Sequence, residues 1–374
     1  MDPAPAHLRL ARHARLRDLM RVAGLDALLI TSLPNVAYLT GLFASAAGVV
    51  ITRDRIALIT DGRYLGMARE LVADLPGVDL VITPASKPFD LAFAEGLCSI
   101  VNGRAGFEAA HLTVKRHHDL KTRLASMAPG CGLEGTEGLV EGLRILKDEW
   151  ELAVMTEAGG RLSDAAKCII PKALAGMMER QMAAVIEAEL RRVGFDKPAF
   201  DTIVASGLNS AVPHYRAGDR ILTAGDLVVL DFGGMFQGYA VDLTRTITIG
   251  PADARQRRLL EDVAAAQDAG FAIVREGLPA TDIDRATRDV MERAGLGSVF
   301  GHGTGHGLGL EVHERPRVAP FRAELPGEPL QPGMVFTIEP GAYFPDWGGA
   351  RIEDDAALTS SGARWLTDVP RFWT

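Results

Sequence analysis

Thiols and long apolar runs are scarce in this chain of 374 residues, and its 40 basic residues are outnumbered by 48 acidic ones. It has three cysteines, Cys98, Cys131 and Cys168, and no two of them form a CxxC pair. Such a sparse, odd set argues against a disulfide framework and is typical of a reducing compartment. The net charge of −8 and the pI of about 5.7 argue against a nucleic-acid partner.

Nothing in the sequence indicates export or insertion into a membrane. The basic N-terminus, MDPAPAHLRLARHARL, lacks the apolar core of a signal peptide. The longest apolar runs, such as LDALLI, are much shorter than a bilayer requires. We therefore expect a cytoplasmic protein that has no membrane partner.

The length of the chain predicts two domains, and the first has an α/β pattern. Helical and strand patterns alternate through residues 1–143. RLARHARLRDLMRVAG predicts a helix that ends at Gly24, LDALLITS a buried strand, and GVVITRDRIALITD a hairpin that turns at residues 53–55. Between the strand and the hairpin, the regularity of LPNVAYLTGL is broken by Pro34, Asn35 and Gly41.

Residues 144–374 read as helix, helix, two strands, helix, helix and further strands, so the whole chain is predicted to be α/β (α+β). LVVLDFGG and GYAVDLTRTITIG are separated by a short turn and should pair antiparallel. Asp231 and Asp242 can then meet across the ladder. MVFTIEPGAY and GARIEDDAALT form a second β-rich set. The two similar halves suggest an internal pseudo-two-fold repeat.

Five residues in five short motifs read as one metal site. The motifs are VLDFGG, YAVDLTRT, HGTGHGLG, TIEPGAY and GARIEDD, and the residues are Asp231, Asp242, His306, Glu339 and Glu353. Four carboxylates around one imidazole carry too much negative charge to be buried without cations. Oxygen ligands with one nitrogen suit Mn²⁺, Co²⁺, Fe²⁺ or Zn²⁺. Two such ions would balance the charge, and a two-metal site activates a bridging water for hydrolysis.

The ordered motifs resemble those of the pita-bread metallopeptidases, a family that includes methionine aminopeptidase, aminopeptidase P, prolidase and creatinase. PNVAYLTG, TDGRY and LRILKDEWEL resemble the creatinase-type N-terminal domain of the aminopeptidase P and prolidase branch, which argues against a plain methionine aminopeptidase. The resemblance implies a creatinase-like α/β domain (residues 1–143) and a pita-bread catalytic domain (residues 144–374). It also implies a dinuclear exopeptidase that hydrolyses Xaa-Pro bonds, either an Xaa-Pro aminopeptidase or an Xaa-Pro dipeptidase.

The same resemblance assigns roles to the five ligands. Asp231 would chelate one metal ion with both oxygens, Asp242 and Glu353 would bridge the two ions, and His306 and Glu339 would complete the second. Glu339 would also carry the water proton to the leaving nitrogen. Mn²⁺ is the favoured metal for both positions, and Co²⁺, Zn²⁺ and Fe²⁺ remain alternatives.

Three further histidines fall on motif positions of the family. His214 and His313 would steady the tetrahedral intermediate or the substrate backbone, and His302 would hold the residue after the scissile bond. Arg351 lies two residues before Glu353, so on a strand it faces the same side and would orient a metal carboxylate. Arg317 would meet the C-terminal carboxylate of the substrate, or it is a surface arginine in a Pro-rich loop.

Other residues are expected to lie outside the site or are ambiguous. Asp354 and Asp355 are not expected to be ligands, Tyr215 does not separate the two peptidases, and Tyr343 and Trp347 either line the pocket or pack beside it. We expect the scattered histidines of the first domain to be solvated surface residues, and adjacent histidines on a helix are a poor chelator. These histidines are His7, His13, His111, His117 and His118.

Three alternatives to the Xaa-Pro peptidase stay open. They are an exopeptidase of the same family without a preference for proline, a creatinase-like C–N hydrolase, and a non-catalytic binding protein of the same fold. The last two do not use the metal ligands or have lost them, so retention of all five argues against both. The resemblance further implies a homodimer and small peptide substrates with proline in the second position.

Overall fold

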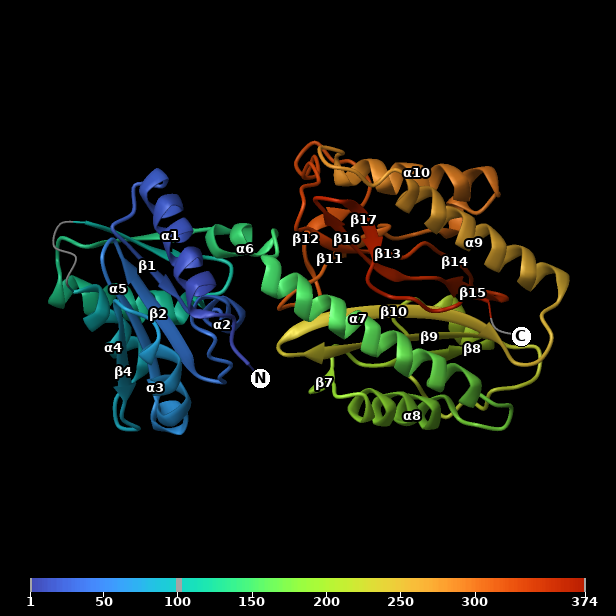
Figure 1. Ribbon diagram of the computed structural model, residues 1–374, viewed down its shortest axis with the longest axis horizontal. Coiled ribbons are helices and arrows are strands. Elements are labelled where there is room, and N and C mark those ends of the chain that lie inside the picture. The colour runs from blue at the N-terminus through green and yellow to red at the C-terminus, as the bar shows by residue number, and fades with distance from the viewer. Residues whose placement is uncertain (1, 99–102, 373–374) are drawn as a thin grey trace. The chain divides into compact units, whose positions relative to one another are not determined.

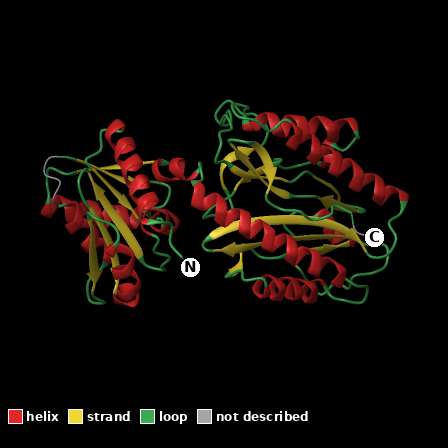
Figure 2. Cartoon of the chain, in the orientation of Figure 1, coloured by secondary structure: helices red, strands yellow, loops and turns green. Residues whose placement is uncertain are grey.

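The computed structural model describes residues 2–98 and 103–372. The chain forms two compact units, Met1–Arg144 and Ile145–Thr374, called here the N-terminal and the C-terminal unit. Both mix helices with strands, which confirms the predicted class (Figure 1; Figure 2). Among the described residues, no helix is both long and apolar enough to cross a membrane.

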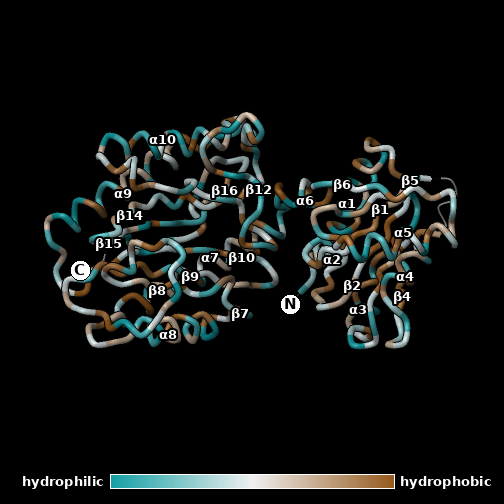
Figure 3. Tube along the Cα trace, turned by 180° about the vertical axis from the view of Figure 1, so that it is seen from behind, coloured by the Kyte–Doolittle hydropathy of each residue, from teal (hydrophilic) through white to brown (hydrophobic). Residues whose placement is uncertain are grey.

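The N-terminal unit is built on a mixed six-stranded sheet with the order β4-β3-β2-β1-β5-β6. The strands β1, β2 and β3 pair antiparallel, whereas β4, β5 and β6 join in parallel. The strands are β1 (Ala27–Ile30), β2 (Ala47–Thr52), β3 (Ile56–Asp61), β4 (Val78–Thr83), β5 (Arg104–Glu108) and β6 (Gly132–Thr136). The helices are α1 (Ala6–Val22), α2 (Leu33–Thr40), α3 (Leu65–Ala73), α4 (Phe89–Leu97), α5 (Val114–Met127) and α6 (Leu139–Arg144). Hydrophobic stretches follow the central strands (Figure 3).

Local sequence signals predicted most of this unit correctly. The hairpin β2–β3 and the end of α1 before Gly24, which has a φ of 68°, are confirmed. The expectation of irregular chain at LPNVAYLTGL is wrong, because residues 33–40 form α2. Pro34 lies in the first turn of this helix, where no backbone N–H is needed, and Gly41 ends it with a φ of 81°.

One histidine of the N-terminal unit contradicts the prediction of a solvated surface. His13 is only 1% exposed, and its Nε2 lies 2.7 Å from the carbonyl oxygen of Leu39. Burial lowers the pKa of His13 to about 4. The basic face of α1 is thus partly turned inward, where backbone carbonyls of α2 satisfy its polar groups.

The C-terminal unit repeats one order of elements, a pair of helices followed by antiparallel strands. The first half contains α7 (Glu149–Ile169), α8 (Glu179–Arg192), β7 (Lys197–Pro198), β8 (Ile203–Ser206), β9 (Leu227–Phe236) and β10 (Tyr239–Thr248). The second half contains α9 (Ala254–Ala272), α10 (Ala280–Arg293), β11 (Gly305–Gly307), β12 (Glu314–Val318), β13 (Val335–Ile338), β14 (Gly341–Phe344), β15 (Gly348–Arg351), β16 (Asp354–Thr359) and β17 (Gly362–Trp365). α7 begins sharply because Asp148 and Glu151 form a capping box.

The hairpin β9–β10 places two of the predicted ligands. Its turn, Gln237-Gly238, has φ values of 48° and 84°, as a tight two-residue connection requires. The register pairs Asp231 with Thr244 and Asp242 with Gly233. Asp231 and Asp242 therefore face the same side as diagonal neighbours, which confirms that they meet across the ladder.

Candidate metal centre and active site

A cavity of about 810 Å³ opens in the C-terminal unit and gathers the predicted site residues. Its walls come from β9, β10, β11 and the segments around β12, β13 and β15. All ten residues that the sequence singled out for the site line it: His214, Asp231, Asp242, His302, His306, His313, Arg317, Glu339, Arg351 and Glu353. These residues are spread over more than a hundred positions of the chain, so the fold alone brings them together.

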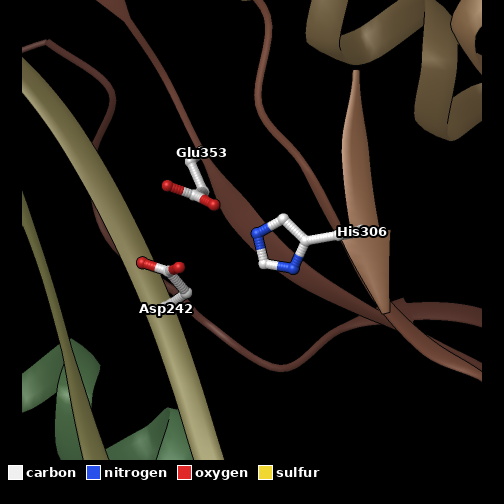
Figure 4. A group of neighbouring side chains, drawn as sticks. All are labelled: Asp242, His306 and Glu353. Carbon is white, nitrogen blue, oxygen red and sulfur yellow. The ribbon is translucent and has the colours of Figure 1, made fainter. Parts of the chain in front are cut away.

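Three of the five predicted ligands converge most closely. Asp242, His306 and Glu353 each offer one ligand atom, and these atoms lie within 4.8 Å of one another. Figure 4 shows the two carboxylates and the imidazole turned toward a common point. Glu339 is adjacent, because its Oε1 lies 3.5 Å from Nε2 of His306. This spacing suits ligands around a cation.

Two of the candidate ligand carboxylates each have a buried oxygen that no described protein group satisfies. Among the described residues, Oδ1 of Asp231 and Oδ1 of Asp242 are buried and have no hydrogen-bond partner. Burial, followed by the charges of Asp231 and Asp355, raises the pKa of Asp242 well above its usual range. Burial likewise raises the pKa of Glu339 to about 8. Orphaned acceptors among mutually repelling acids are what divalent cations would satisfy, so the residues present fit a metal site.

In the described part of the chain, one side chain donates to the carboxylate of Glu353, and other acids lie close to it. Thr244 donates its hydroxyl to Oε2 of Glu353 at 2.6 Å. Burial and then the charge of Asp242 raise the pKa of Glu353 well above its usual range. Sequence analysis missed Thr244, although it lies two residues after Asp242 on a strand and therefore faces the same side.

His306 is held in the form that binds metals. Burial and the neighbouring His313 lower the pKa of His306 to about 4, so the ring is neutral at physiological pH. Its Nδ1 lies 3.1 Å from the carbonyl oxygen of Gly307, which leaves Nε2 with a free lone pair facing the acids. The flanking glycines are required, because a Cβ at Gly305 would lie 2.0 Å from the carbonyl oxygen of Thr337.

Arg351 links the Asp231 carboxylate to Tyr343, which in turn contacts His302. Its Nη2 donates to Oδ2 of Asp231 at 2.5 Å, and its Nη1 donates to the hydroxyl of Tyr343 at 2.8 Å. That hydroxyl lies 3.0 Å from Nε2 of His302, whose pKa burial lowers to about 4. The predicted contact of Arg351 with a candidate ligand is present, and Tyr343 packs behind it. Trp347 lies under the guanidinium of Arg255 at 3.7 Å.

The other predicted residues lie at the wall or beneath the site. His214 and His313 are exposed, and the His313 ring lies 4.3 Å from that of His306. Arg317 is half-buried, and its Nη1 donates to the carbonyl oxygen of Pro320 at 3.4 Å. Asp355 is buried behind the site and accepts the backbone N–H of Asp242 at 3.0 Å, as a supporting residue would.

Comparison with known proteins agrees with this geometry. Residues 153–360 match Metallopeptidase family M24, and residues 12–146 match the Creatinase/Prolidase N-terminal domain. The chain is 34% identical to an Xaa-Pro dipeptidase of Pyrococcus horikoshii over 96% of this chain and 97% of that protein.

Solved structures agree over the same length. A structure of the Xaa-Pro dipeptidase from Bacillus anthracis has a TM-score of 0.89 and 33% identity, covering 98% of this chain and 100% of that one. The X-Pro aminopeptidase from Thermotoga maritima has a TM-score of 0.84 and 30% identity, covering 96% of this chain and 98% of that one. The chain belongs to Metallopeptidase family M24, with a Creatinase/Prolidase N-terminal domain before its catalytic unit.

Proposed function

We propose that this protein is a dinuclear metal-dependent exopeptidase that hydrolyses Xaa-Pro bonds in small peptides. One observation carries the metal-dependent chemistry: four carboxylates and one histidine line a single cavity, and two of the carboxylates, Asp231 and Asp242, have a buried oxygen with no hydrogen-bond partner among the described residues. The proline specificity is supported by the Xaa-Pro dipeptidases and the X-Pro aminopeptidase that resemble the chain over nearly its full length. The dipeptidase activity is our first candidate and the aminopeptidase activity our second.

The ligand set would hold two divalent ions. Asp231, Asp242, His306, Glu339 and Glu353 supply four carboxylates and one imidazole, which suits Mn²⁺ first and also Co²⁺, Zn²⁺ or Fe²⁺. When bound, two such ions lower the pKa of a water molecule and polarise the scissile carbonyl. Arg351 keeps the Asp231 carboxylate in place by its short hydrogen bond and so fixes one wall of the ligand set.

The side chains around the ligands would bind the substrate and move the proton. Glu339 takes the water proton and delivers it to the leaving nitrogen, a transfer that suits a carboxylate on the cavity wall beside His306. The nitrogen of proline in an Xaa-Pro bond is tertiary and carries no hydrogen, so this delivery matters. His214 and His313, exposed to the cavity, donate to the oxygen of the tetrahedral intermediate.

Two residues would decide how the far end of the substrate is held. His302 is half-buried, and its two ring nitrogens contact Gly303 and Tyr343, so it presents a rigid ring to the residue after the scissile bond. Arg317 reaches the cavity with a guanidinium that the described contacts engage only weakly, at 3.4 Å. A free carboxylate at the end of a dipeptide is the partner that this guanidinium suits.

The test compares the hydrolysis of Ala-Pro, Ala-Pro-Ala and Ala-Ala by chelated protein before and after addition of Mn²⁺ or Co²⁺. Cleavage of Ala-Pro alone, restored by metal, is the expected result. Efficient cleavage of Ala-Pro-Ala would favour the aminopeptidase, and cleavage of Ala-Ala at the same rate would favour an exopeptidase without proline specificity. No cleavage by protein that holds two metal ions would contradict the proposal.

We also propose that the protein is a cytoplasmic homodimer. The dimer is suggested by the family resemblance, and the three cysteines, which form no disulfide, suit a reducing compartment. A light-scattering mass equal to one chain would contradict the dimer.

A further inference from the structure

A buried arginine lies directly behind the candidate metal site. Arg245 is only 1% exposed, although it lies within β10 between two residues that face the opposite side. A guanidinium has five N–H donors, and Arg245 directs all five at oxygens. Nε donates to the carbonyl of Pro370 at 3.0 Å, Nη1 to the carbonyls of Thr244 and Glu353 at 2.9 and 2.7 Å, and Nη2 to Oδ1 of Asp354 and the carbonyl of Val369, both at 2.8 Å.

These acceptors belong to three segments that are separate in the sequence. Thr244 lies on β10, two residues after Asp242, and Glu353 belongs to the second half of the C-terminal unit. The two segments also form a β-bridge, in which the N–H of Glu353 donates to the carbonyl of Thr244 at 3.1 Å. Val369 and Pro370 belong to the C-terminal segment of the chain. Arg245 therefore joins the strand of one candidate ligand to the backbone of another and fastens both to this segment.

The hydrogen bonds around Arg245 continue through Asp354 toward the strand that carries Glu339. Oδ1 of Asp354 also accepts the hydroxyl of Thr367 at 2.6 Å, and its Oδ2 accepts the side-chain amide of Gln267 at 3.0 Å. The amide of Gln267 also donates to the carbonyl of Ile338, the residue before Glu339. The side chains of Gln267 on α9 and Asp354 on β16 and the backbone carbonyl of Ile338 on β13 thus form one hydrogen-bond network with Arg245 behind the site.

We propose that Arg245 and the C-terminal segment Thr367–Pro370, called here the clamp, are positioning elements that set the separation of Asp242 and Glu353 for metal binding. The inference rests on the metal site of the proposed function. The two carboxylates come from different halves of the unit and lie close together, so they repel each other when both are ionised and no cation is present. A cross-link with five fixed hydrogen bonds resists this repulsion and pre-organises the ligands.

The test measures Co²⁺ affinity and the Co²⁺ absorption spectrum of the full-length protein and of Arg245→Met. The matched control is Arg9→Met, which removes a 3% exposed arginine of the N-terminal unit that also donates to backbone carbonyls, those of Ala4, Thr40 and Leu71. We expect Arg245→Met to lower Co²⁺ affinity by about 10- to 100-fold and to alter the spectrum. Arg9→Met should leave both unchanged while lowering the melting temperature.

Two outcomes would overturn the inference in different ways. If Arg245→Met binds Co²⁺ with the affinity and spectrum of the parent protein, the clamp is only structural and the proposed function survives. If the parent protein itself binds no Co²⁺, the clamp and the proposed function both fail.

A second pair of measurements covers the case in which Arg245→Met does not fold. Thr367→Val removes one hydrogen bond to Asp354 and should lower Co²⁺ affinity by a smaller factor, about threefold to tenfold. In the unmodified protein, Co²⁺ should slow hydrogen exchange at the N–H groups of Leu366 and Asp368, which bond to Asp355 and Ser163. Exchange at these two amides that is unchanged by bound Co²⁺ would overturn the proposal.

Discussion

Buried carboxylates occur in both units, but their surroundings differ. In the N-terminal unit, Oε2 of Glu108 accepts the backbone N–H groups of Thr31 and Ser32 at 2.6 and 2.7 Å. Its Oε1 accepts the amide of Asn35 at 2.6 Å. In the C-terminal unit, Oδ1 of Asp231 and of Asp242 finds no donor among the described residues. Burial is the leading cause that raises the pKa of Glu108, as it is for Asp242.

The contrast shows that donors, more than burial, separate a structural acid from a candidate ligand. Three hydrogen bonds replace the water that Glu108 loses, so this acid can stay where it is with no cation. Among the candidate ligands, Asp231 has a guanidinium donor in Arg351 and Glu353 a hydroxyl donor in Thr244, but Asp231 and Asp242 each keep an oxygen without a donor in the described part of the chain, and the acids repel one another. The sequence pattern alone does not show whether a buried acid has hydrogen-bond donors, because the donors come from distant segments. The following predictions test this difference, from the largest effect on the site to the smallest.

Asp242→Asn should have the largest effect. The substitution removes a charge that lies with His306 and Glu353 around the candidate cation position. We expect kcat/KM for Ala-Pro to fall about 10³-fold, since several kcal/mol of metal-dependent stabilisation are at stake. The metal-free variant should at the same time unfold at a higher temperature, because one repelling charge is gone. Activity within tenfold of the parent protein, at equal metal content, would contradict the assignment.

Arg351→Met should weaken metal binding without removing a ligand. Arg351 is 4% exposed and donates to Asp231, Tyr343 and Thr244. Its loss frees the Asp231 carboxylate and should reduce metal affinity about 10- to 100-fold. Titration with Mn²⁺ or Co²⁺ followed by calorimetry measures this change. High metal concentration should restore part of the activity, whereas a defect that no metal concentration corrects would mean that Arg351 acts in another way.

Arg317→Gln should separate dipeptides from longer substrates. If Arg317 meets the terminal carboxylate, KM for Ala-Pro should rise about tenfold or more, as expected for one charge-assisted hydrogen bond. KM for Ala-Pro-Ala should change little, because its carboxylate lies one residue further on. Arg315→Gln is a suitable control, since this neighbour also lines the cavity but pairs with Glu328. An equal rise in KM for both peptides would show that Arg317 does not bind the terminal carboxylate of the dipeptide.

Metal-free protein should lose stability as the pH rises from 6.5 to 8. Folded Glu339 has a pKa of about 8 against an ordinary 4.5, so in this window the folded state holds a proton that the unfolded state has released. Stability then falls with rising pH by up to about 1.4 kcal/mol per pH unit for each such group. His302 and His306, with pKa values of about 4 against 6.5, disturb stability mainly below this window.

Bound metal provides the control for this pH dependence. Metal ions keep the acids ionised in the folded state, so chemical denaturation of the loaded protein should show little slope between pH 6.5 and 8. An equally flat profile for the metal-free protein would mean that its acids are already satisfied by the protein.

The sequence predicted the ligand strands because their signals are local. Asp231 and Asp242 flank a tight turn with alternating apolar residues, so the pairing of β9 with β10 follows from the chain itself. The glycines around His306 likewise indicate a place where neighbouring backbone segments approach too closely for a Cβ atom. The motif order, together with the family resemblance, then indicated that five distant residues form one site.

What the sequence did not predict depends on contacts between distant segments. Helix α2 is not evident from the sequence because proline usually breaks a helix, whereas Pro34 occupies the first turn, which tolerates it. Arg245 and Gln267 gave no signal because each is an isolated polar residue whose partners lie far along the chain. Burial of His13 was hidden for the same reason, since its acceptor is a backbone carbonyl of α2.

Glu108→Gln should have the smallest effect on the site and a clear effect on stability. A glutamine keeps the size of the side chain but turns one acceptor into an N–H donor, which then faces either Asn35 or the two backbone N–H groups. Asn35 cannot simply turn its amide around, because its oxygen already accepts from Arg144 at 2.6 Å. The free energy of unfolding should therefore fall by about 1–3 kcal/mol.

The control for Glu108→Gln is Glu134→Gln, which breaks an exposed ion pair with Arg104 in the same unit and should cost at most about 1 kcal/mol. Metal affinity and kcat/KM should stay within about twofold for both variants. This pair separates the two kinds of buried acid directly. Loss of the Glu108 charge should lower the free energy of unfolding, because its hydrogen-bond donors lose their acceptor, and should leave metal affinity unchanged. Loss of the Asp242 charge should instead lower metal affinity. If Glu108→Gln also weakened metal binding, hydrogen-bond satisfaction would no longer distinguish a structural acid from a ligand.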